Sequence, residues 1–240
     1  MQTVSFSGCF SSTSPVTCGV PQRSVLSPVL LLLYMADVLT IARCHGIGAY
    51  SYADNTQLYR HAPTDLCVTS ASAVASCIGE LNRWMCSNRL KLNATRPTSS
   101  FLGMCQQIEK ANFHSVQLCG FDDYLSTTVT CLGLLIDTEL TFAAHIKHLT
   151  GRCFYQLCQL RTVHHALSVK ASWTLVHAFV NSSVDYCNSI LGSTSAAHLR
   201  PLQCILNAAA RFIDKRRKID RITDYLREEL HWLPVQYRHT

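Results

Sequence analysis

Paired cysteines are absent from this sequence, although cysteine itself is abundant. The chain has 240 residues and 13 cysteines, and no two cysteines stand in a C-x-x-C pair. Their number is odd and the chain is longer than typical disulfide-framework domains, so we expect reduced, mostly buried thiols. His145 with His148, and His164 with His165, have zinc-ligand spacings without cysteine partners, so we predict no zinc finger.

Charged residues are also scarce. They make up 15% of the chain while hydrophobic residues make up 48%, which excludes a disordered tail. This length allows one large domain or two small ones. The net charge of +6 suits a polyanionic partner without requiring one.

Long apolar runs and an N-terminal leader are missing as well. The run from Val29 to Met35 is far shorter than the about 20 residues that cross a bilayer, and it predicts a buried helix. No charged leader precedes an apolar core at the N-terminus, so we expect no signal peptide. We therefore predict an intracellular protein, nuclear or cytoplasmic, with no membrane contact.

The stretch from Ser51 to Tyr59 reads as strand, tight turn, strand. Tyr52 and Ala53 lead into a corner formed by Asp54 and Asn55, two residue types that tolerate turn geometry. Taken alone, such a pair usually marks only a turn. Here the corner also presents the carboxylate of Asp54 at the tip of a hairpin, where a metal ion could bind it.

Two further stretches flank this hairpin in a suggestive order. GVPQRSVLSP occupies Gly19 to Pro28, and Trp84-Met85 is followed by NRLKLN at Asn88 to Asn93. In order and spacing these stretches resemble the reverse transcriptases of LINE-type (non-LTR) retrotransposons. That family typically shows GVPQGSVLGP, then YADDTQLY, then WM-x-x-N-x-LKLN. The resemblance extends over nearly the whole chain.

The resemblance implies an α+β fold. We expect a partial polymerase palm over residues 1–137, built from a small antiparallel sheet with packed helices. An all-helical, thumb-like region is expected over residues 138–240. The resemblance also implies RNA-directed DNA polymerase chemistry, with Mg²⁺ as cofactor and with an RNA template and a DNA primer as partners.

The catalytic residues depart from the family pattern. The family holds two metal ions with an early aspartate and an Asp pair at the hairpin, because Mg²⁺ prefers charged oxygen ligands. Asp54 matches the first member of the pair, Asn55 replaces the second, and no Asp or Glu precedes Gly19. Arg96 stands where the family has a lysine thought to assist the leaving pyrophosphate, and arginine is a poor proton donor.

The resemblance assigns further binding roles. Pro21, Gln22, Arg23 and Ser24 would lie beside the template and the incoming nucleotide, although Arg23 replaces a family glycine. The segment from Val129 to Asp137 resembles the primer-grip hairpin YLGV-x-ID, with Leu132 and Gly133 at its turn.

A basic run later in the chain has no family motif of its own. It consists of Lys215, Arg216, Arg217 and Lys218. It is either a solvated or nuclear-import-like loop, or a surface for the nucleic-acid backbone, because thumb helices in the family press on the template–primer duplex.

Periodicity supplies the remaining expectations. We predict a strand over residues 2–7, a helix from near Ser24 to about Ile41, a helix over residues 65–88, a short strand over residues 99–103 and a turn at Asp122-Asp123. From Thr141 onward the pattern is helical, with Ser168 as a helix cap.

Three functions are consistent with these observations. The chain could be a reverse-transcriptase domain, a non-catalytic nucleic-acid-binding remnant, or a decayed transposon fragment without a selected role. The incomplete carboxylate set predicts no measurable polymerase activity for the isolated chain.

Overall fold

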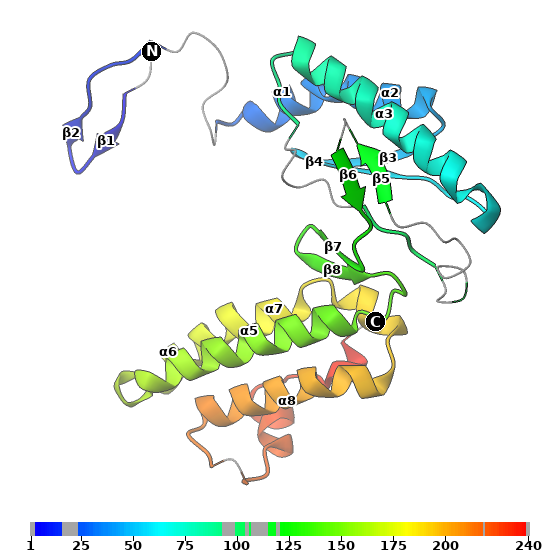
Figure 1. Cartoon of the computed structure of the whole chain (residues 1–240). Coiled ribbons are helices and arrows are strands. Elements are labelled where there is room, and N and C mark those ends of the chain that lie inside the picture. Colours follow the sequence, from blue (N-terminus) through cyan, green and yellow to red (C-terminus); the bar gives the residue numbers. More distant parts are fainter. Residues whose placement is uncertain are drawn as a thin grey trace. The chain divides into compact units, whose positions relative to one another are not determined.

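The computed structural model describes residues 3–15, 24–92, 99–103, 106, 115–118, 121–217 and 219–238. The chain divides into two compact units (Figure 1). The first comprises Met1–Ala94 with Val116–Asp122, and the second comprises Thr95–Ser115 with Asp123–Thr240. Helices and small antiparallel hairpins make up both units, as expected of an α+β protein.

A short hairpin opens the described chain. The strands β1 (Ser5–Phe6) and β2 (Cys9–Phe10) pair in antiparallel fashion around a turn at Ser7 and Gly8, which both have positive φ. The strand predicted over residues 2–7 is therefore only partly right, because the chain turns back at Ser7. All four strand residues are exposed, so this hairpin adds nothing to a core.

Two helices stand where the sequence predicted one. Helix α1 (Ser27–Tyr34) ends at Met35, and helix α2 (Ala36–Cys44) begins directly after it. Pro28 fits the first turn of α1, where its missing N–H would have no intrahelical partner. Met35 has a ψ of 0°, which breaks the helix and leaves its side chain 8% exposed in the core.

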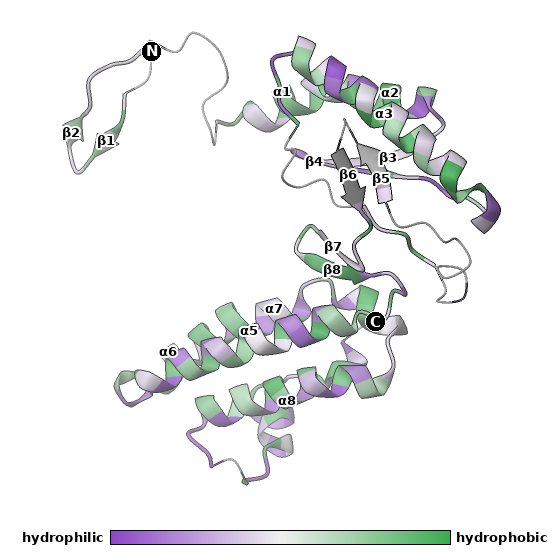
Figure 2. Cartoon of the chain, in the orientation of Figure 1, coloured by the Kyte–Doolittle hydropathy of each residue, from purple (hydrophilic) through white to green (hydrophobic). Residues whose placement is uncertain are grey.

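The expectation of a buried helix after Val29 is wrong for α1, because none of its residues is buried. Figure 2 shows the hydrophobic character of this segment. By length and composition alone, Ser27–Cys44 could cross a membrane, and most of its residues are exposed. One such stretch near the N-terminus is weak evidence, because signal sequences and core helices of soluble proteins pass the same test.

The first unit has a small core between α2 and helix α3 (Cys67–Ser87), which follows a 3₁₀ turn at Thr64–Leu66. Its buried members come from three segments: Met35, Val38, Ala42, Ile47, Cys77 and Leu81. Trp84 and Met85 pack against this core as partly buried residues, which agrees with the predicted helix over residues 65–88. His45 Nε2 lies 2.7 Å from Glu80 Oε2 and joins α2 to α3.

Strands β3 (Gly48–Tyr52) and β4 (Asn55–Tyr59) form the predicted central hairpin. Gly48 is paired with Tyr59, and a Cβ at Gly48 would lie only 2.3 Å from the Tyr59 ring. A larger residue at Gly48 would therefore displace the ring, which stacks on Tyr50 at 5.5 Å.

The next segment differs from its predicted form. Residues 99–103 form no strand. The Ser99 carbonyl still accepts a hydrogen bond of 2.9 Å from the Ser126 N–H, and the Gly103 N–H donates one of 3.0 Å to the Thr138 carbonyl. Strands β5 (Ser115–Leu118) and β6 (Phe121–Tyr124) pair with each other. Asp122 and Asp123 belong to β6, so the predicted turn at this acidic pair is wrong.

Strands β7 (Thr128–Cys131) and β8 (Leu134–Asp137) form the last hairpin. Within the part of the chain that the structure describes, the strands form four separate two-stranded sheets. The expected hairpin over residues 129–137 is therefore present.

Helices form the rest of the second unit, as the pattern after Thr141 predicted. The long ones are α5 (Ala143–Thr162) and α8 (Ala196–Ile213), and both alternate between hydrophobic and hydrophilic residues (Figure 2). Between them lie a 3₁₀ turn (His164–Ala166), α6 (Val169–Val176), a π-turn (His177–Asn181), α7 (Ser182–Asp185) and a 3₁₀ helix (Asn188–Ser193). Ser168 caps α6, because its side chain accepts a hydrogen bond of 3.2 Å from the Ala171 N–H.

A single apolar core joins these helices. Its least exposed large members are Leu157, Leu191, Leu202, Ile205, Leu206 and Ile213. Burial of a leucine or isoleucine side chain contributes about 1.5–3 kcal/mol, so this cluster dominates the stability of the unit. Phe154, Trp173 and Phe179 lie at apolar helical spacings, but they are 38%, 42% and 46% exposed.

The segment after α8 completes that core. It contains a π-turn (Tyr225–Glu229) and a 3₁₀ turn (Val235–Tyr237), with Trp232 and Val235 buried. The Val235 N–H donates to Gln203 Oε1 at 3.0 Å, which ties the segment to α8. Arg238 Nη1 donates to Asp185 Oδ1 at 2.6 Å and to Asn181 Oδ1 at 2.9 Å, so the segment is also held by α7 and the π-turn.

Candidate functional site

The tip of the β3–β4 hairpin lies one residue earlier than the sequence predicted. Tyr52 pairs with Asn55, so Ala53 and Asp54 form the two-residue turn and Asn55 already belongs to β4. Ala53 has a φ of +53°, whereas the prediction gave the unusual backbone conformation to Asp54 and Asn55. A left-handed alanine is costly, and such residues often occur at functional turns.

The carboxylate at this tip is exposed and is engaged by its neighbour. Asn55 Nδ2 donates to Asp54 Oδ1 at 3.4 Å. A metal site would need a second oxygen ligand beside this carboxylate, whereas Asn55 directs an N–H donor toward it. In the described part of the chain, no group of three His, Cys, Asp or Glu side chains could hold a metal ion.

Several predicted site residues lie outside the described residues: Pro21, Gln22, Arg23, Arg96 and Lys218. Ser24 is described, and its hydroxyl accepts a hydrogen bond of 3.2 Å from the Ser27 N–H just before α1. This contact gives Ser24 a local structural role at the start of the helix. Its predicted contact with a nucleotide or template stays a prediction.

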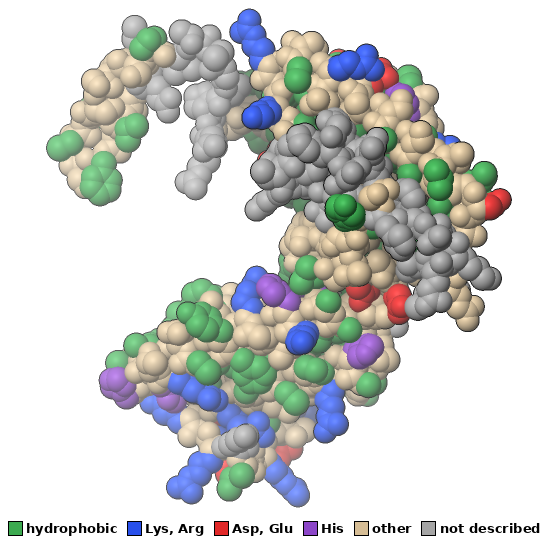
Figure 3. All heavy atoms as spheres, viewed as in Figure 1, with side chains coloured by type: hydrophobic (Ala, Val, Ile, Leu, Met, Phe, Trp, Pro, Cys, Tyr) green, Lys and Arg blue, Asp and Glu red, His purple; other side chains and the backbone are tan. Residues whose placement is uncertain are grey.

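Much of the basic segment after α8 is engaged within the protein. Arg216 forms an ion pair with Asp214, and its guanidinium lies 5.5 Å from the centre of the Tyr225 ring. The Arg217 backbone N–H donates to Asp220 Oδ2 at 2.9 Å, and the Arg217 side chain is exposed. Figure 3 shows Lys and Arg side chains around this end of the second unit, whose helices from α5 onward we call the helical unit. Lys215 and Arg217 are therefore better placed for an external anion than Arg216.

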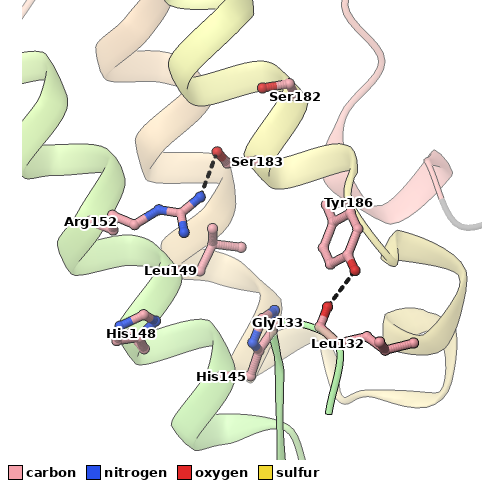
Figure 4. A pocket seen from close by; sticks show the side chains of 9 residues that line it. All are labelled: Leu132, Gly133, His145, His148, Leu149, Arg152, Ser182, Ser183 and Tyr186. Atoms are coloured by element: carbon pink, nitrogen blue, oxygen red, sulfur yellow. Dashed lines mark hydrogen bonds between the residues drawn. The ribbon is translucent and has the colours of Figure 1, made fainter. Parts of the chain in front are cut away.

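The predicted primer-grip turn borders a hollow of about 360 Å³ in the second unit (Figure 4). Leu132 and Gly133 form the turn between β7 and β8, and both have positive φ, at 47° and 87°. This is the geometry of a type I′ turn, which matches the twist of a hairpin. The other lining residues come from α5 and from the region of α7: His145, His148, Leu149, Arg152, Ser182, Ser183 and Tyr186.

Hydrogen bonds hold two sides of this hollow in place. The Tyr186 hydroxyl donates to the Leu132 carbonyl at 2.5 Å. Arg152 Nη2 donates to Ser183 Oγ at 3.1 Å, which fixes the guanidinium between α5 and α7. His145 Nδ1 accepts from the Leu135 N–H at 3.3 Å. Figure 4 shows the first two of these bonds across the hollow.

The electrostatic environment of the hollow is positive. Burial lowers the pKa of His145, and the nearby His148 and Arg152 lower it further. Cationic neighbours disfavour a second positive charge, so they act in the same direction as burial. A neutral His145 with Nδ1 accepting a hydrogen bond carries its proton on Nε2.

Sequence reasoning did not find this cluster. His145 and His148 were considered only as zinc ligands, and Arg152 was not considered. The available signal was their spacing, because residues at i, i+3 and i+7 share one face of a helix. That face becomes a site only where it meets the β7–β8 turn and Tyr186, which the spacing does not reveal.

Comparison with known proteins finds relatives that share one description. Three relatives from Drosophila melanogaster are similar to most of the chain. A probable RNA-directed DNA polymerase from transposon X-element is 23% identical over 88% of this chain. The RNA-directed DNA polymerase from mobile element jockey is 22% identical over 84% of the chain. A probable RNA-directed DNA polymerase from transposon BS is 26% identical over 85% of the chain. The chain carries a LINE-type reverse-transcriptase-like region.

This reverse-transcriptase-like region spans less than a quarter of each relative, since it covers 23%, 22% and 23% of their lengths. No family model matches the chain, and no solved structure matches it. The predicted resemblance is thereby confirmed from sequence relatives. The roles assigned to Asp54, Asn55 and the other site residues of the reverse-transcriptase-like region stay predictions.

Proposed function

We propose that this reverse-transcriptase-like region binds the backbone of an RNA–DNA template–primer duplex and does not extend the primer as an isolated chain. The absence of primer extension is supported by one observation at the hairpin tip. There, Asn55 follows Asp54, and its amide N–H donates to the Asp54 carboxylate. The relatives are named as RNA-directed DNA polymerases, which supports nucleic acid as the partner class.

The residues present do not fit a pair of magnesium ions. Mg²⁺ takes oxygen ligands in octahedral geometry, and polymerase-type sites rely on several carboxylates to neutralise the developing charge. At this tip there is one carboxylate, exposed and already bonded by an amide N–H. We therefore derive no catalytic step through a metal ion for this chain.

Support for duplex binding comes from the cations of the helical unit. Lys215 and Arg217 are exposed on the loop after α8, and Arg152 lies beside the β7–β8 turn. Proteins recognise A-form duplexes mostly through shape and backbone contacts, which cations supply without reading sequence. The net charge of +6 favours the same partner.

We assign the first unit to the remains of a palm and the helical unit to a thumb. In the sequence, the boundary between palm and thumb was predicted at residues 137 and 138. The β7–β8 hairpin packs with the helices, because Leu134 belongs to the same core cluster as α5 and α8. A primer-grip hairpin fixed to a thumb would move with the helices that hold the duplex.

The test combines binding with primer extension. A fluorescent DNA primer annealed to an RNA template is titrated with the full chain, and extension is followed in Mg²⁺ and in Mn²⁺. We expect salt-dependent binding without extension, and we expect no extension by Asn55→Asp if further carboxylates are needed. Extension by the unchanged chain, or absence of binding even at low salt, would overturn the proposal.

Two variants make the extension assay decisive. If Asn55→Asp extends the primer, the double variant Asp54→Asn/Asn55→Asp is the matched control, because it moves the single carboxylate without adding one. Activity in the first variant and silence in the second would show that one substitution had disabled a working site.

One observation favours a second candidate, a decayed fragment without a selected role. In α1, Leu32 and Leu33 are 60% and 69% exposed, so this unit leaves apolar surface uncovered. This candidate predicts a broad, non-cooperative unfolding transition in urea. A single cooperative transition followed by circular dichroism and by tryptophan fluorescence would count against it.

A further inference from the structure

The hollow beside the β7–β8 turn collects positive charge without a carboxylate in its lining. Arg152 supplies a permanent cation, and His145 and His148 supply imidazole rings from the same face of α5. The remaining lining groups are apolar side chains, hydroxyls and the turn itself. Such a lining favours an anion and disfavours a cation.

The hydroxyl protons around this hollow are already assigned. Ser182 donates to the Ala178 carbonyl at 2.5 Å, and Ser183 donates to the Phe179 carbonyl at 2.9 Å. The Ser183 oxygen also accepts from Arg152, and Tyr186 donates to the Leu132 carbonyl. The hydroxyls therefore hold the walls of the hollow in place, and the side-chain N–H groups of Arg152 and His145 on α5 are the donors for a ligand.

Arg152 is prepared for such a ligand. Its guanidinium carries five N–H donors in a planar fork, and the structure assigns one of them, on Nη2, to Ser183. A guanidinium that is already oriented loses less conformational freedom when it binds an oxyanion. His145 adds a second donor, because the Leu135 N–H fixes the ring with its proton on Nε2.

We propose that this hollow binds a phosphate group. The choice of phosphate over a carboxylate rests on the proposed function, because a template–primer duplex would bring phosphodiesters to this unit. A volume of about 360 Å³ exceeds that of a single phosphate and leaves room for part of an attached sugar. The same chemistry would accept a phosphodiester of a nucleic acid or a free phosphate such as pyrophosphate.

The experiment compares two variants of the same helix in the full chain. Arg152→Gln removes the proposed ligand-binding cation. Lys147→Gln removes one positive charge from an exposed position of α5 that does not line the hollow. Affinity for an RNA–DNA duplex is measured by fluorescence anisotropy over a range of salt, and pyrophosphate binding is measured by calorimetry.

We expect Arg152→Gln to weaken duplex binding about tenfold, as loss of a charge-assisted hydrogen bond does. The slope of log K against log salt should fall by about 0.7–0.9, the value for one phosphate contact. Lys147→Gln should change the affinity less than about twofold and leave that slope unaltered, because a remote exposed charge is screened by salt.

A second pair of variants guards against a folding defect. Arg152→Lys keeps the charge but loses the planar fork, so its affinity should lie between the unchanged chain and Arg152→Gln. His148→Gln alters an exposed ring in the lining of the hollow and should weaken binding in the same direction. Thermal unfolding of each variant confirms that the helical unit is intact.

The outcomes separate this site from the proposed function. If duplex binding persists but Arg152→Gln and Lys147→Gln behave alike, the phosphate site is wrong and duplex binding stands. If the duplex does not bind but pyrophosphate binds and Arg152→Gln abolishes it, the site stands and the proposed function fails. Equal binding of acetate and pyrophosphate would replace phosphate with a general oxyanion and overturn the proposal.

Discussion

The hydroxyl of Tyr186 donates a hydrogen bond of 2.5 Å to the carbonyl of Leu132, across 54 positions of the sequence. Leu132 is the first turn residue between β7 and β8, and its φ is +47°. A left-handed leucine is unfavourable by itself, so a contact from outside the hairpin helps to hold it. Tyr186 thereby couples the geometry of the predicted primer-grip turn to the helical unit.

Replacing Tyr186 with phenylalanine should lower the free energy of unfolding by about 1 kcal/mol, the usual net contribution of a hydrogen bond. The loss stays modest because Leu132 is 44% exposed, and water can replace the hydroxyl. Urea denaturation measures the difference. Tyr155→Phe is the control, since Tyr155 is 60% exposed on α5, and equal losses in both variants would remove the special role of Tyr186.

Ala53→Gly should stabilise the first unit slightly, by up to about 1 kcal/mol. Glycine removes the steric cost of a positive φ, about 1–2 kcal/mol, but loses more entropy on folding than alanine. Ala73→Gly in α3 is the control of opposite sign, because glycine inside a helix costs about 1 kcal/mol. If both variants are destabilised equally in chemical denaturation, the strain assigned to Ala53 is wrong.

Acidification should destabilise the helical unit through His145. Its folded-state pKa lies below the ordinary value of 6.5 because of burial and of the neighbouring His148 and Arg152 side chains. The unfolded chain therefore binds the proton more readily, so stability is fully present above pH 6.5 and is lost as the pH falls below it. The loss continues until the pH reaches the lowered folded-state pKa.

Thermal melts between pH 7.5 and pH 5 should show this loss. His145→Asn should reduce it, because asparagine can accept the Leu135 N–H without titrating. His165→Asn, in an exposed position, is the matched control for the other histidines. An unchanged pH dependence in His145→Asn would assign the effect elsewhere.

Cysteine reactivity should follow burial. Burial raises the pKa of the Cys77 and Cys153 thiols, so the reactive thiolate is rare at both positions. Among the described cysteines, the exposed ones are Cys9, Cys44, Cys86, Cys158 and Cys204. Brief alkylation of the native protein, followed by mass spectrometry, should label these five before Cys77 and Cys153, and full denaturation should remove the difference. Early labelling of Cys77 would contradict the packing of α3.

Local patterns predicted the elements whose determinants are local. The β3–β4 hairpin follows from its turn residues, and the helix over residues 65–88 follows from its apolar spacing. The cap at Ser168 and the helical character of the chain after Thr141 were also predicted in this way. In each case, neighbours within a few residues decide the conformation. The β7–β8 hairpin was predicted from the resemblance to the family's primer-grip motif.

Other features depend on partners that are distant in sequence. The break at Met35 divides a uniformly apolar run that has no helix-breaking residue at that position. The turn of the central hairpin shifts by one residue because Tyr52 pairs with Asn55. Trp173 and Phe179 fit an apolar spacing with the buried Val176 and Val180, but they are 42% and 46% exposed.

In the candidate site, too, the locally determined residues could be predicted and those that depend on distant partners could not. Asp54 and Asn55 could be singled out from a motif, and the structure adds the amide-to-carboxylate contact that disfavours a metal. The hollow around Arg152 could not be foreseen, because its walls come from a turn, a long helix and a short helix that are separated in the sequence. Helical spacing marks a face but does not say what lies opposite.

The segment that carries Trp232 and Val235 also determines when the helical unit can finish folding. During synthesis, α5 and α8 emerge from the ribosome before the residues that cover them, and the Val235 N–H reaches Gln203 only after that. Until then, part of the apolar face of α8 is available to chaperones or to another nascent chain. A premature stop codon between Ile213 and Trp232 would therefore yield a helical bundle with an open core, which cellular quality control would remove.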